Sequence, residues 1–585
     1  MPEVLFGSSD LQAKDLHLRF TSPITTYSAN QLEDVVPLIK AAEAAAKSGA
    51  WVALMLSYEA APAFDEALKT HAPTFLPLAW AAVFDKPATP AQSAATTMAP
   101  ESTTTTFDLN WKSQISRSEY GDGVRRIRDL IARGDTYQVN YTFPLRSHFS
   151  GSPSIWYDTL CIAQGADYCA YLDLGRYKIL SISPELFFER RGVSIKTKPM
   201  KGTINRGRWA QEDEERARQL AESRKDRAEN VMIVDLLRND LGKISVPGSV
   251  KVSKLFEVER YETLWQMTST VESTLRNDVE LPDVLAALFP CGSVTGAPKI
   301  RTMGIIHELE RFPRGIYTGT IGFLSPGGDC AFNVAIRTVV LDSDTGAATF
   351  AVGGGITIDS TPEREYDECL LKSSFLTSPV PHFRLFESIL LEGGEFFLLG
   401  RHLERLRASA KYFNFQFRED QVVSELDRLV ATSSADRWKI RLLLSKDGKF
   451  EIDPVALGLP RSEPLRVTLA AGPVDSQDRF LFHKTTNRIV YDQAVAQRPE
   501  CDDVILWNVL GEITESSVAN IVLPIDGQLF TPPQASGLLA GTFRDQLLAD
   551  GEIRERVVHK EELRQASRLF LINSVRKWMP AMLVD

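Results

Sequence analysis

A glutamate and a lysine in the first half of the chain have the types and spacing of a reaction centre. Glu185 lies in the run SPELF at 183–187, and Lys201 lies sixteen positions later in KPMKGT at 198–203. A neutral amine can attack carbon, and a nearby carboxyl group can transfer a proton. The pair therefore predicts a site that combines a nucleophilic lysine with a general acid.

Two acidic pairs have the spacing of one helix face. Asp226 and Glu229 are three positions apart, and so are Glu365 and Glu368. Residues three apart on a helix lie side by side, so each pair could offer two carboxylates to one hard cation such as Mg²⁺. An arbitrary acidic pair of this kind is more often a solvated helix face.

Both helices and strands are expected around these residues. Residues 177–182 and 348–352 have the pattern of strands, and residues 211–239 have the pattern of one helix with an acidic start. No repeat of 20 to 50 residues is evident, which argues against a solenoid. The alternation predicts an α+β fold with large sheets.

The amino-acid composition indicates which classes of protein are compatible with the chain. The chain has 585 residues, 44% hydrophobic residues and a net charge of −10, which are typical of ordinary protein domains and disfavour a nucleic-acid partner. No stretch approaches the length of a membrane span, and the start lacks the pattern of a secretory signal. Six scattered cysteines without a C-x-x-C pair fit a reducing, cytoplasmic location.

Two breaks divide the chain. Residues 87–106 are rich in Pro, Ala, Ser and Thr, and we expect a solvated loop there. Prolines interrupt the pattern again at 377–382, which we take as the linker between the domains 1–376 and 383–585.

Motifs of the first domain resemble, in order, those of the chorismate-utilising enzymes, the family of anthranilate synthase, aminodeoxychorismate synthase and isochorismate synthase. Besides KPMKGT they are RAENVMIVDLLRNDLG (227–242), CGSVTGAPK (291–299), RGIYTG (314–319), AIRT (335–338) and GGGITIDSTPEREYDE (353–368). The resemblance implies an α/β sandwich with large antiparallel sheets and chorismate as the substrate.

The same resemblance implies roles for single residues. Mg²⁺ would be bound by Glu229 and Glu368, with Glu365 and Asp226 as direct or water-mediated ligands. Substrate binding is implied for Tyr317 and Arg337, at the enolpyruvyl carboxylate, and for Thr295, Gly353, Gly354 and Gly355.

Two positions separate the chemistries within this family. Lysine at 201 resembles aminodeoxychorismate synthase, whereas alanine there is typical of anthranilate synthase. Met267 stands where many relatives carry a histidine that assists pyruvate loss, and methionine cannot transfer a proton. The implied reaction is addition of neutral Lys201 at ring C2 while Glu185 protonates the departing C4 hydroxyl, followed by displacement of the lysine by ammonia.

The ammonia has no visible source in the sequence. The chain lacks a G-x-C-x-G elbow with a downstream His and Glu, which is the signature of a class I glutaminase. The resemblance therefore implies a separate glutamine amidotransferase subunit, or free ammonium.

Motifs of the second domain resemble those of fold-type IV pyridoxal-phosphate enzymes, which include amino-acid transaminases and aminodeoxychorismate lyase. They are FRLFES (383–388), GRHLERL (400–406), FHKTTNR (482–488), GEITESS (511–517), GLLAGTFR (537–544) and NSVR (573–576). The resemblance implies an α+β fold of two subdomains, pyridoxal 5′-phosphate as cofactor, and a homodimer through this domain.

The implied cofactor contacts are chemically specific. Lys484 would bind the cofactor as a Schiff base, Glu515 would keep the pyridine nitrogen protonated, and Arg405 would contact the phosphate, with Thr542 and Ser517 completing the cradle. His402 and His483 are interpreted as structural.

Leu444 marks a departure, because lyases often place a substrate-binding arginine near this position. The candidates for the substrate carboxylates are therefore Arg441, Lys446 and Arg576.

The presence of both domains in one chain limits the functions that the two resemblances allow. Aminodeoxychorismate is the product of a lysine-type synthase and the substrate of one type IV enzyme, so the two resemblances together imply synthesis of 4-aminobenzoate for folate. Three alternatives stay open: an anthranilate-synthase activity of the first half, an amino-acid transaminase activity of the second, or a second half that serves only as a dimerisation module.

Overall fold

The computed structural model describes residues 3–7, 17–73, 75–88, 109–377, 381–432, 436–458, 461, 463–566 and 568–584. The predicted loop at 87–106 lies outside these ranges from residue 89 on, as do residues 378–380 of the predicted linker. The chain forms two compact units, Met1–Asn205 with Ala217–Val380 and Arg206–Arg216 with Pro381–Asp585.

The first unit contains two large sheets, and the strands described in them pair in antiparallel fashion. Among the described residues, the nine-stranded sheet has the order β15 (Gly296–Ala297), β7 (Gln138–His148), β19 (Ala347–Ile356), β18 (Thr338–Asp342), β9 (Tyr177–Ser183), β8 (Tyr168–Asp173), β1 (Glu3–Gly7), β2 (Leu18–Thr21), with β6 (Lys112–Ser113) paired to β7. The ten-stranded sheet has the order β12 (Met200–Asn205), β14 (Leu264–Thr274), β11 (Ser194–Lys198), β10 (Leu186–Arg191), β17 (Cys330–Val334), β16 (Thr320–Leu324), β4 (Trp51–Leu56), β5 (Ala79–Phe84), β3 (Thr25–Ala29), with β13 (Lys251–Arg260) paired to β14.

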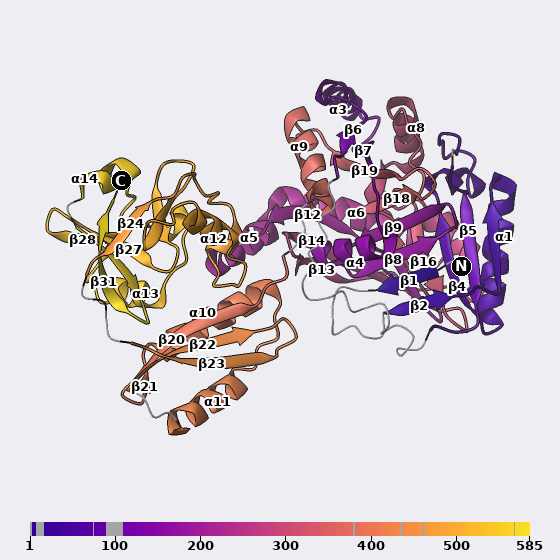
Figure 1. Cartoon of the computed structure of the whole chain (residues 1–585). Helices are drawn as coiled ribbons and strands as arrows, with labels where there is room; N and C mark the ends of the chain where they lie inside the picture. Colours follow the sequence, from indigo (N-terminus) through magenta and orange to yellow (C-terminus); the bar gives the residue numbers. More distant parts are fainter. Residues whose placement is uncertain are drawn as a thin grey trace. The chain divides into compact units, whose positions relative to one another are not determined.

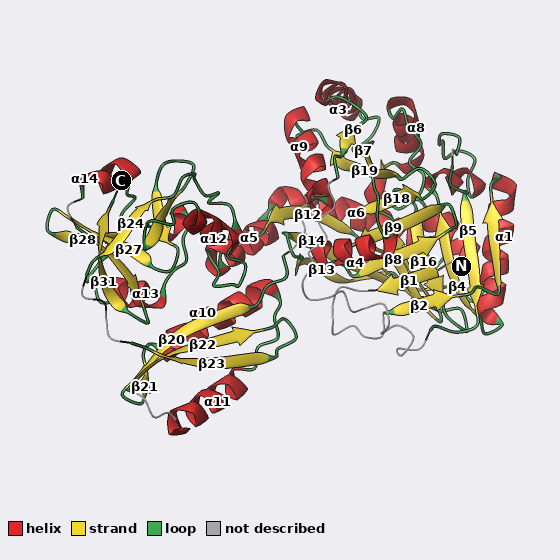
Figure 2. Cartoon of the chain, in the orientation of Figure 1, coloured by secondary structure: helices red, strands yellow, loops and turns green. Residues whose placement is uncertain are grey.

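Helices cover the outer faces of both sheets (Figures 1 and 2). The ten-stranded sheet packs against α1 (Leu32–Lys47), α6 (Arg224–Gly242) and α7 (Leu281–Leu288). The nine-stranded sheet packs against α3 (Arg117–Ala132), α4 (Pro153–Gln164), α8 (Lys299–Leu309) and α9 (Pro362–Ser373). Short 3₁₀ helices lie at Tyr58–Ala63, Gly292–Val294 and Ser374–Leu376.

Side-chain alternation along β4 shows how the layers form. Val52, Leu54 and Leu56 point into the core under the helices, whereas Ala53 and Met55 point into the core between the sheets. Successive side chains of a strand face opposite sides, so a strand that is buried on both faces needs apolar residues at every position. The predicted α/β sandwich is confirmed.

The helix predicted at 211–239 is wrong in one respect, because two helices occupy the region. α5 (Ala210–Glu222) ends before Ser223, and the Ser223 hydroxyl accepts a hydrogen bond from the backbone N–H of Asp226 at 3.2 Å. A serine N-cap satisfies a donor at a helix start and so favours a new helix there. The strands predicted at 177–182 and 348–352 are confirmed as parts of β9 and β19.

The second unit contains two smaller sheets, in agreement with the predicted two-subdomain α+β fold. The four-stranded sheet has the order β21 (Glu395–Phe396), β20 (Leu385–Glu392), β22 (Arg437–Leu444), β23 (Phe450–Ala456), and its helices are α10 (Leu399–Phe413) and α11 (Glu419–Thr432). The eight-stranded sheet has the order β26 (Ile513–Ser516), β25 (Asp503–Trp507), β24 (Leu465–Leu469), β31 (Lys577–Leu583), β30 (Leu569–Asn573), β27 (Asn520–Ile525), β28 (Gln528–Thr531), β29 (Arg554–Glu555). Its helices are α12 (Ile489–Ala496), α13 (Thr542–Ala549) and α14 (Lys560–Gln565), with short 3₁₀ helices at Arg479–Leu481 and Gln534–Ser536.

Residues 206–216 fold as part of the second unit, although the predicted boundaries placed them in the first domain. The nearly buried side chains of Arg206 and Asp213 form a bidentate ion pair with two N···O distances of 2.7 Å. The hydroxyl of Tyr412 donates to the carbonyl of Gly207 at 2.6 Å. Polar groups at this depth need such partners, so the contacts specify where the segment packs.

None of the helices in the described ranges has the length and apolar character that a bilayer crossing requires.

Candidate active sites

Lys201 lies on β12, at the edge of the ten-stranded sheet, and its amine faces α6. The Lys201 Nζ lies 3.5 Å from Glu229 Oε2, and both side chains are less than one-fifth exposed. β12 pairs with β14 and is in contact with α6, so the strand brings the KPMKGT and RAEN motifs together.

Glu185 lies between β9 and β10 and is 3% exposed. Burial raises the pKa of its carboxyl group to about 7, although the Ser293 hydroxyl, the backbone of Met200 and the charge of Lys201 act in the opposite direction. Ser293 donates to Glu185 Oε1 at 2.7 Å. A carboxyl group with this pKa can donate a proton near neutral pH, and it lies within the electrostatic reach of Lys201.

Gly355 on β19 allows two functional groups to approach the backbone. A Cβ atom at this position would lie 2.4 Å from Lys201 Nζ and 2.6 Å from Gln138 Nε2. Gln138 is fully buried, and neither polar atom of its side-chain amide has a hydrogen-bond partner among the described residues. Buried amides are normally hydrogen-bonded, so an unsatisfied one beside the lysine amine marks a place for a polar ligand.

The predicted metal ligands lie around Lys201 but do not form a ready metal cluster. Glu365 and Glu368 on α9 lie within the electrostatic reach of Lys201, and Asp226 lies against Gly202. Within the described ranges, no three His, Cys, Asp or Glu side chains have metal-binding spacing.

Two of the predicted metal ligands form ion pairs with lysine side chains. Glu229 faces Lys201, and Glu368 forms an ion pair with Lys372 at 2.8 Å. Burial raises the pKa of Glu365, whereas Lys372 lowers the pKa of Glu368. Carboxylate oxygens are the ligands that Mg²⁺ prefers, so the donor set fits this ion in chemistry.

Tyr317 and Arg337 are close enough for the charge of each to affect the pKa of the other. The Arg337 guanidinium donates to Gln164 Oε1 and to the carbonyl of Lys372, both at 2.9 Å. Burial lowers the pKa of Arg337 to about 10, and its backbone has a φ of 52°, which is rare for a residue with a side chain. Strained residues of this kind gather at functional sites.

Lys372 is a residue of this site that the sequence analysis did not identify. Its amine donates to the carbonyl of Gly353 at 2.9 Å, so it joins the predicted glycine run to α9. Burial lowers the pKa of Lys372, but the Glu368 carboxylate outweighs burial and raises it.

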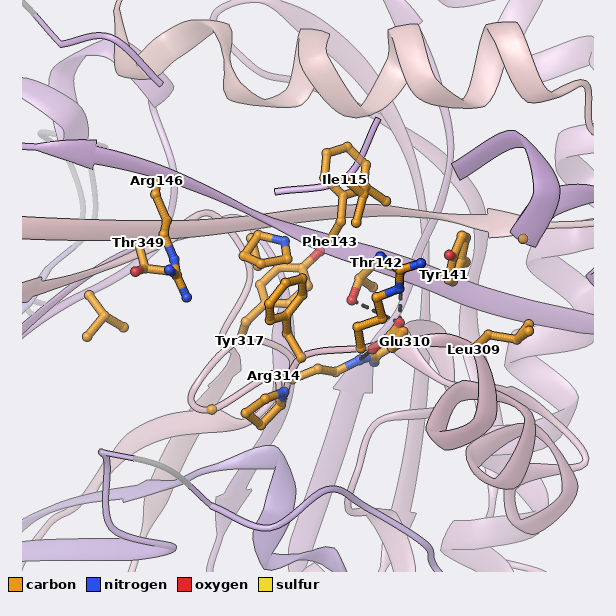
Figure 3. A pocket seen from close by; sticks show the side chains of 18 of the residues that line it. Ile115, Tyr141, Thr142, Phe143, Arg146, Leu309, Glu310, Arg314, Tyr317 and Thr349 are labelled. Atoms are coloured by element: carbon orange, nitrogen blue, oxygen red, sulfur yellow. Dashed lines mark hydrogen bonds and ion pairs between the residues drawn. The ribbon is translucent and has the colours of Figure 1, made fainter. Parts of the chain in front are cut away.

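A separate cavity of about 500 Å³ lies beside the loop that carries Tyr317 (Figure 3). Of the predicted site residues, Tyr317 is the one that lines it. The buried pair Glu310 and Arg314 fixes the loop, with N···O distances of 2.7 and 2.9 Å, and Arg314 also donates to the carbonyl of Asn140 at 2.7 Å. This cavity is distinct from the surroundings of Lys201.

Thr295 and Met267 are both fully buried. The Thr295 hydroxyl donates to the carbonyl of Cys291 at 3.1 Å, and its backbone carbonyl accepts from the N–H of Asn140 at 2.8 Å, so Thr295 also has a structural role. Met267 lies on β14, one residue before Thr268, which pairs with Met200 of β12.

The second unit contains a cavity of about 810 Å³ that all the predicted cofactor residues line: Arg405, Lys484, Glu515, Ser517 and Thr542. These residues come from α10, the loop before α12, the end of β26 with the residue after it, and α13, so the fold gathers motifs that are far apart in the sequence. A cavity of this size is typical of a small-molecule site.

Lys484 follows the 3₁₀ helix Arg479–Leu481, and its amine lies 4.6 Å from the centre of the Phe386 ring. Burial and then the positive charge of Arg405 lower the pKa of the Lys484 amine to about 8. A lysine with a lowered pKa is neutral more often and is a better nucleophile toward an aldehyde.

Glu515 is held by three donors. The Tyr491 hydroxyl donates at 2.7 Å, the N–H of Leu539 at 3.1 Å and the side-chain amide of Asn520 at 3.3 Å. Burial nevertheless raises the pKa of Glu515 to about 7. A carboxylate fixed in this way could pair with a protonated ring nitrogen, which would remove the cost of its burial.

Arg405 is oriented by Glu387, which the sequence analysis missed. The guanidinium donates to both carboxylate oxygens of Glu387, at 2.9 and 2.7 Å. Although burial alone would raise the pKa of Glu387, Arg405 and His402 hold it at about 2. His402 also lies 3.2 Å from the Thr542 hydroxyl, so this histidine links the pair to the start of α13.

These residues fit pyridoxal phosphate. The cavity combines an amine, a carboxylate and an arginine with the amino end of α13, where unpaired N–H groups favour a phosphate. A Cβ atom at Gly541 would lie 2.2 Å from Asn520 Oδ1, so only glycine permits this approach. The backbone N–H of Ser517 donates to the Asp503 carboxylate at 3.2 Å, and the carbonyl of Ser517 accepts from Arg488.

His483 has the structural role that was expected. Its ring nitrogens lie 2.9 Å from the Ser409 hydroxyl and 3.2 Å from the carbonyl of Arg208.

Of the three candidates for the substrate carboxylates, Arg441 and Arg576 line the cavity, whereas Lys446 is not among its lining residues.

Comparisons with known proteins agree with this arrangement. Residues 9–378 match the family model described as chorismate binding enzyme, and residues 384–584 match the model of amino-transferase class IV. Aminodeoxychorismate synthase component 1 of Salmonella typhimurium is 41% identical over 280 residues, which are 48% of this chain and 61% of the relative. Anthranilate synthase component 1 of Aquifex aeolicus is 39% identical over 272 residues, 46% of this chain and 54% of the relative.

One solved structure supports the fold of the first unit. Anthranilate synthase component I from Streptococcus pneumoniae TIGR4 has a TM-score of 0.54 and 25% identity, and the match covers 64% of this chain and 92% of that one. The chain thus spans less than two thirds of the curated relatives but nearly all of this solved structure. Since the first family model matches well over half of its residues, the chain belongs to the chorismate binding enzymes, with a class IV amino-transferase domain in the same polypeptide.

Proposed function

We propose that the chain makes 4-aminobenzoate in two steps: the first unit aminates chorismate to 4-amino-4-deoxychorismate, and the second eliminates pyruvate from that intermediate. The observation that carries the proposal is the Lys201 amine, which lies beside Glu229 and within electrostatic reach of buried Glu185. The similarity to aminodeoxychorismate synthase component 1 and the class IV domain support it.

In the first step, the neutral amine of Lys201 forms a bond to ring C2 as the C4–O bond breaks. Glu185 gives its proton to the departing hydroxyl, which leaves as water. Ammonia then attacks C4, and the C2–N bond breaks to release the neutral amine of Lys201. The new ammonium group at C4 gives one proton back to the Glu185 carboxylate, so the enzyme returns to its starting state. Gln138 has the free hydrogen-bonding capacity to orient a polar group at this centre.

Mg²⁺ bound by Glu229, Glu365, Glu368 and Asp226 would supply positive charge for the ring carboxylate. Tyr317 and Arg337 would bind the enolpyruvyl carboxylate, with Thr295 and the backbone of Gly353, Gly354 and Gly355 completing the site. Lys372 would keep the glycine strand and α9 together.

In the second step, pyridoxal phosphate, when bound, would supply an electron sink that makes the ring proton next to the amine easier to remove. Lys484 would hold the cofactor and then move this proton, while Glu515 would keep the ring nitrogen protonated. Arg405, Thr542 and Ser517 would bind the phosphate. Departure of pyruvate makes the ring aromatic, which drives the step.

The proposal includes a partner and a setting. Ammonia would come from a separate glutamine amidotransferase subunit, and the second unit would pair with its copy in a homodimer. Six free cysteines support a reducing, cytoplasmic location. Equilibrium sedimentation tests the dimer.

Intact-mass measurement tests the covalent step directly. Wild type mixed with chorismate and Mg²⁺, without ammonium, should gain the mass of chorismate less one water. Lys201→Arg keeps the charge but cannot attack, and it should gain nothing. An equal mass gain in both proteins would refute the role of Lys201.

The similarity to an anthranilate synthase supports one alternative, an anthranilate-synthase activity of the first unit. That activity would release anthranilate and pyruvate from the first unit, even in Lys484→Ala. The transaminase rival for the second unit requires turnover of 2-oxoacids, and an inert dimerisation module requires that pyridoxal phosphate does not bind.

A further inference from the structure

The cavity around Lys484 is rich in positive charge. Among its described lining residues, eight are Lys or Arg and four are Asp or Glu. Several of these cations have carboxylate partners: Arg405 pairs with Glu387, Arg437 with Glu392 and Arg461 with Asp502.

Besides Lys484, three lining cations have no ion-pair partner within the described part of the chain: Lys439, Arg441 and Arg576. Lys439 and Arg441 lie two positions apart on β22, so their side chains share the face that also carries Arg437. The alternate residues Ile440, Leu442 and Leu444 are buried in the core under α10 and α11. The pattern of β22 therefore presents the cations to the cavity because the other face is needed for the core.

Arg576 reaches the same region from the loop between β30 and β31. Ser388, the cross-strand neighbour of Arg441, accepts a hydrogen bond at its carbonyl from the Ser574 hydroxyl at 3.3 Å. The charges of Arg441, Arg576 and Arg488 all act on the Lys439 amine, which places the groups near one another. Like charges held together repel, so an anion that binds between them would be favoured.

Acidic groups near these cations do not neutralise them. Asp453 of β23 is opposite Arg441 in the strand register, yet the two form no ion pair among the described residues. Glu515 is bound by Tyr491, and the Asp503 carboxylate accepts from the N–H groups of Val504 and Ser517. The face of β22 in the cavity thus keeps its positive charge.

We propose that Lys439, Arg441 and Arg576 form a dianion clamp that binds the two carboxylates of the lyase substrate and selects it over amino acids with a single carboxylate. This inference rests on the proposed lyase function and deepens it. Aminodeoxychorismate carries a ring carboxylate and an enolpyruvyl carboxylate, whereas an amino acid with an uncharged side chain carries one carboxylate. A guanidinium binds a carboxylate through two parallel hydrogen bonds, which gives orientation as well as affinity.

The test uses full-length protein loaded with pyridoxal phosphate and supplied with purified aminodeoxychorismate, without ammonium or Mg²⁺, and it follows pyruvate release. Each of Lys439→Gln, Arg441→Gln and Arg576→Gln should raise KM about 10- to 100-fold, since each removes a charged hydrogen bond. The kcat and the cofactor content should change less than about twofold, because the clamp does not touch the reacting atoms. Arg441→Lys should restore part of the affinity.

Lys446→Gln is the matched control. Lys446 lies on the same hairpin, two residues beyond β22, but does not line the cavity, so its KM should equal that of wild type. Unchanged KM values in the three clamp variants, or KM values that rise equally in Lys446→Gln, would overturn the clamp. If wild type binds pyridoxal phosphate but releases no pyruvate, the lyase proposal itself fails.

Inhibition of the wild type gives a second test that does not depend on the folding of any variant. Benzene-1,3-dicarboxylate should inhibit pyruvate release at a concentration at least tenfold lower than benzoate, and added salt should weaken the dicarboxylate more. Equal inhibition by both compounds would contradict a site for two carboxylates.

Discussion

At the scale of single residues, burial sets the protonation of Glu185. Its pKa of about 7 lies above the usual value because the carboxyl group is out of contact with water, while the Ser293 hydroxyl pulls the pKa down. Glu185 must be protonated to act as an acid, so the rate of chorismate consumption should fall as the pH rises above about 7.

Ser293→Ala should move this falling limb to higher pH, because it removes a hydrogen bond that favours the charged form. The measurement is a pH–rate profile at a constant concentration of neutral ammonia. Ser325→Ala, in an exposed turn, is the control and should leave the profile unchanged. A limb at the same pH in Ser293→Ala would contradict the assignment of Glu185 as the acid.

Glu387 provides a second prediction at this scale. Glu387→Gln leaves the half-buried Arg405 without its carboxylate, and loss of one partner of a buried ion pair costs about 3–5 kcal/mol. Urea unfolding of the second unit should show this loss, and retention of pyridoxal phosphate after gel filtration should fall. The exposed Glu395→Gln serves as control, and equal stability of the two variants would show that Glu387 does not hold Arg405.

The sequence predicted candidates for the reacting residues but not the residues that orient them. Lys201, Lys484 and Glu515 lie in motifs whose residue types imply a reaction, and the structure places each in a buried polar environment. Gln138 and Glu387 have no such pattern, because an amide or a lone carboxylate becomes informative only when its burial and partners are known. Glu229 and Glu368, two of the predicted magnesium ligands, form ion pairs with Lys201 and Lys372 in this structure, which local sequence spacing does not reveal.

At the scale of elements, the close approach of β19 to β12 depends on Gly355. In Gly355→Ala the new methyl group would meet two flexible side-chain ends, Lys201 Nζ and Gln138 Nε2, so they would move and the backbone would not. Displacement of a reacting group by about 1 Å can cost about 100-fold in rate. Chorismate consumption should fall by about this factor, with little change in melting temperature.

Gly304→Ala is the matched control, because a Cβ atom at Gly304 in α8 has no neighbour within 4 Å. It should retain full activity and, since alanine favours a helix, equal or greater stability. If Gly355→Ala is also fully active, the backbone of β19 does not border the reaction centre.

The segment 206–216 shows where sequence reasoning failed at this scale. Its acidic start has the pattern of a solvated helix, and its partners lie far along the chain, as Tyr412 does from Gly207. A pattern of local spacing cannot reveal a partner some 200 positions away. By contrast, the strands β9 and β19 were predicted because apolar runs bounded by turns are a local signal.

Asp213→Ala tests whether this segment is part of the second unit. The substitution removes the carboxylate partner of the buried Arg206 guanidinium. It should lower the free energy of unfolding of the second unit by about 3–5 kcal/mol in chemical denaturation. The exposed Glu214→Ala is the control, since its pair with Lys411 lies in solvent. Equal stability of both variants would show that the ion pair does not anchor the segment.

At the scale of the whole molecule, one chain contains a chorismate-binding unit and a class IV amino-transferase unit. The proposed function assigns consecutive steps to the two units. Covalent linkage raises the local concentration of the second activity around the product of the first. Unlabelled aminodeoxychorismate added to a reaction with labelled chorismate should therefore dilute the label in 4-aminobenzoate less than in a mixture of Lys201→Ala and Lys484→Ala proteins. Equal dilution would show that linkage gives no advantage.

Product analysis by mass-resolved chromatography tests the central claim most directly. Wild type, Lys201→Ala and Lys484→Ala would each be given chorismate, Mg²⁺, ammonium and pyridoxal phosphate. The account predicts 4-aminobenzoate and pyruvate from wild type, aminodeoxychorismate without pyruvate from Lys484→Ala, and unchanged chorismate from Lys201→Ala. Anthranilate from wild type, or loss of chorismate without 4-aminobenzoate, would contradict it.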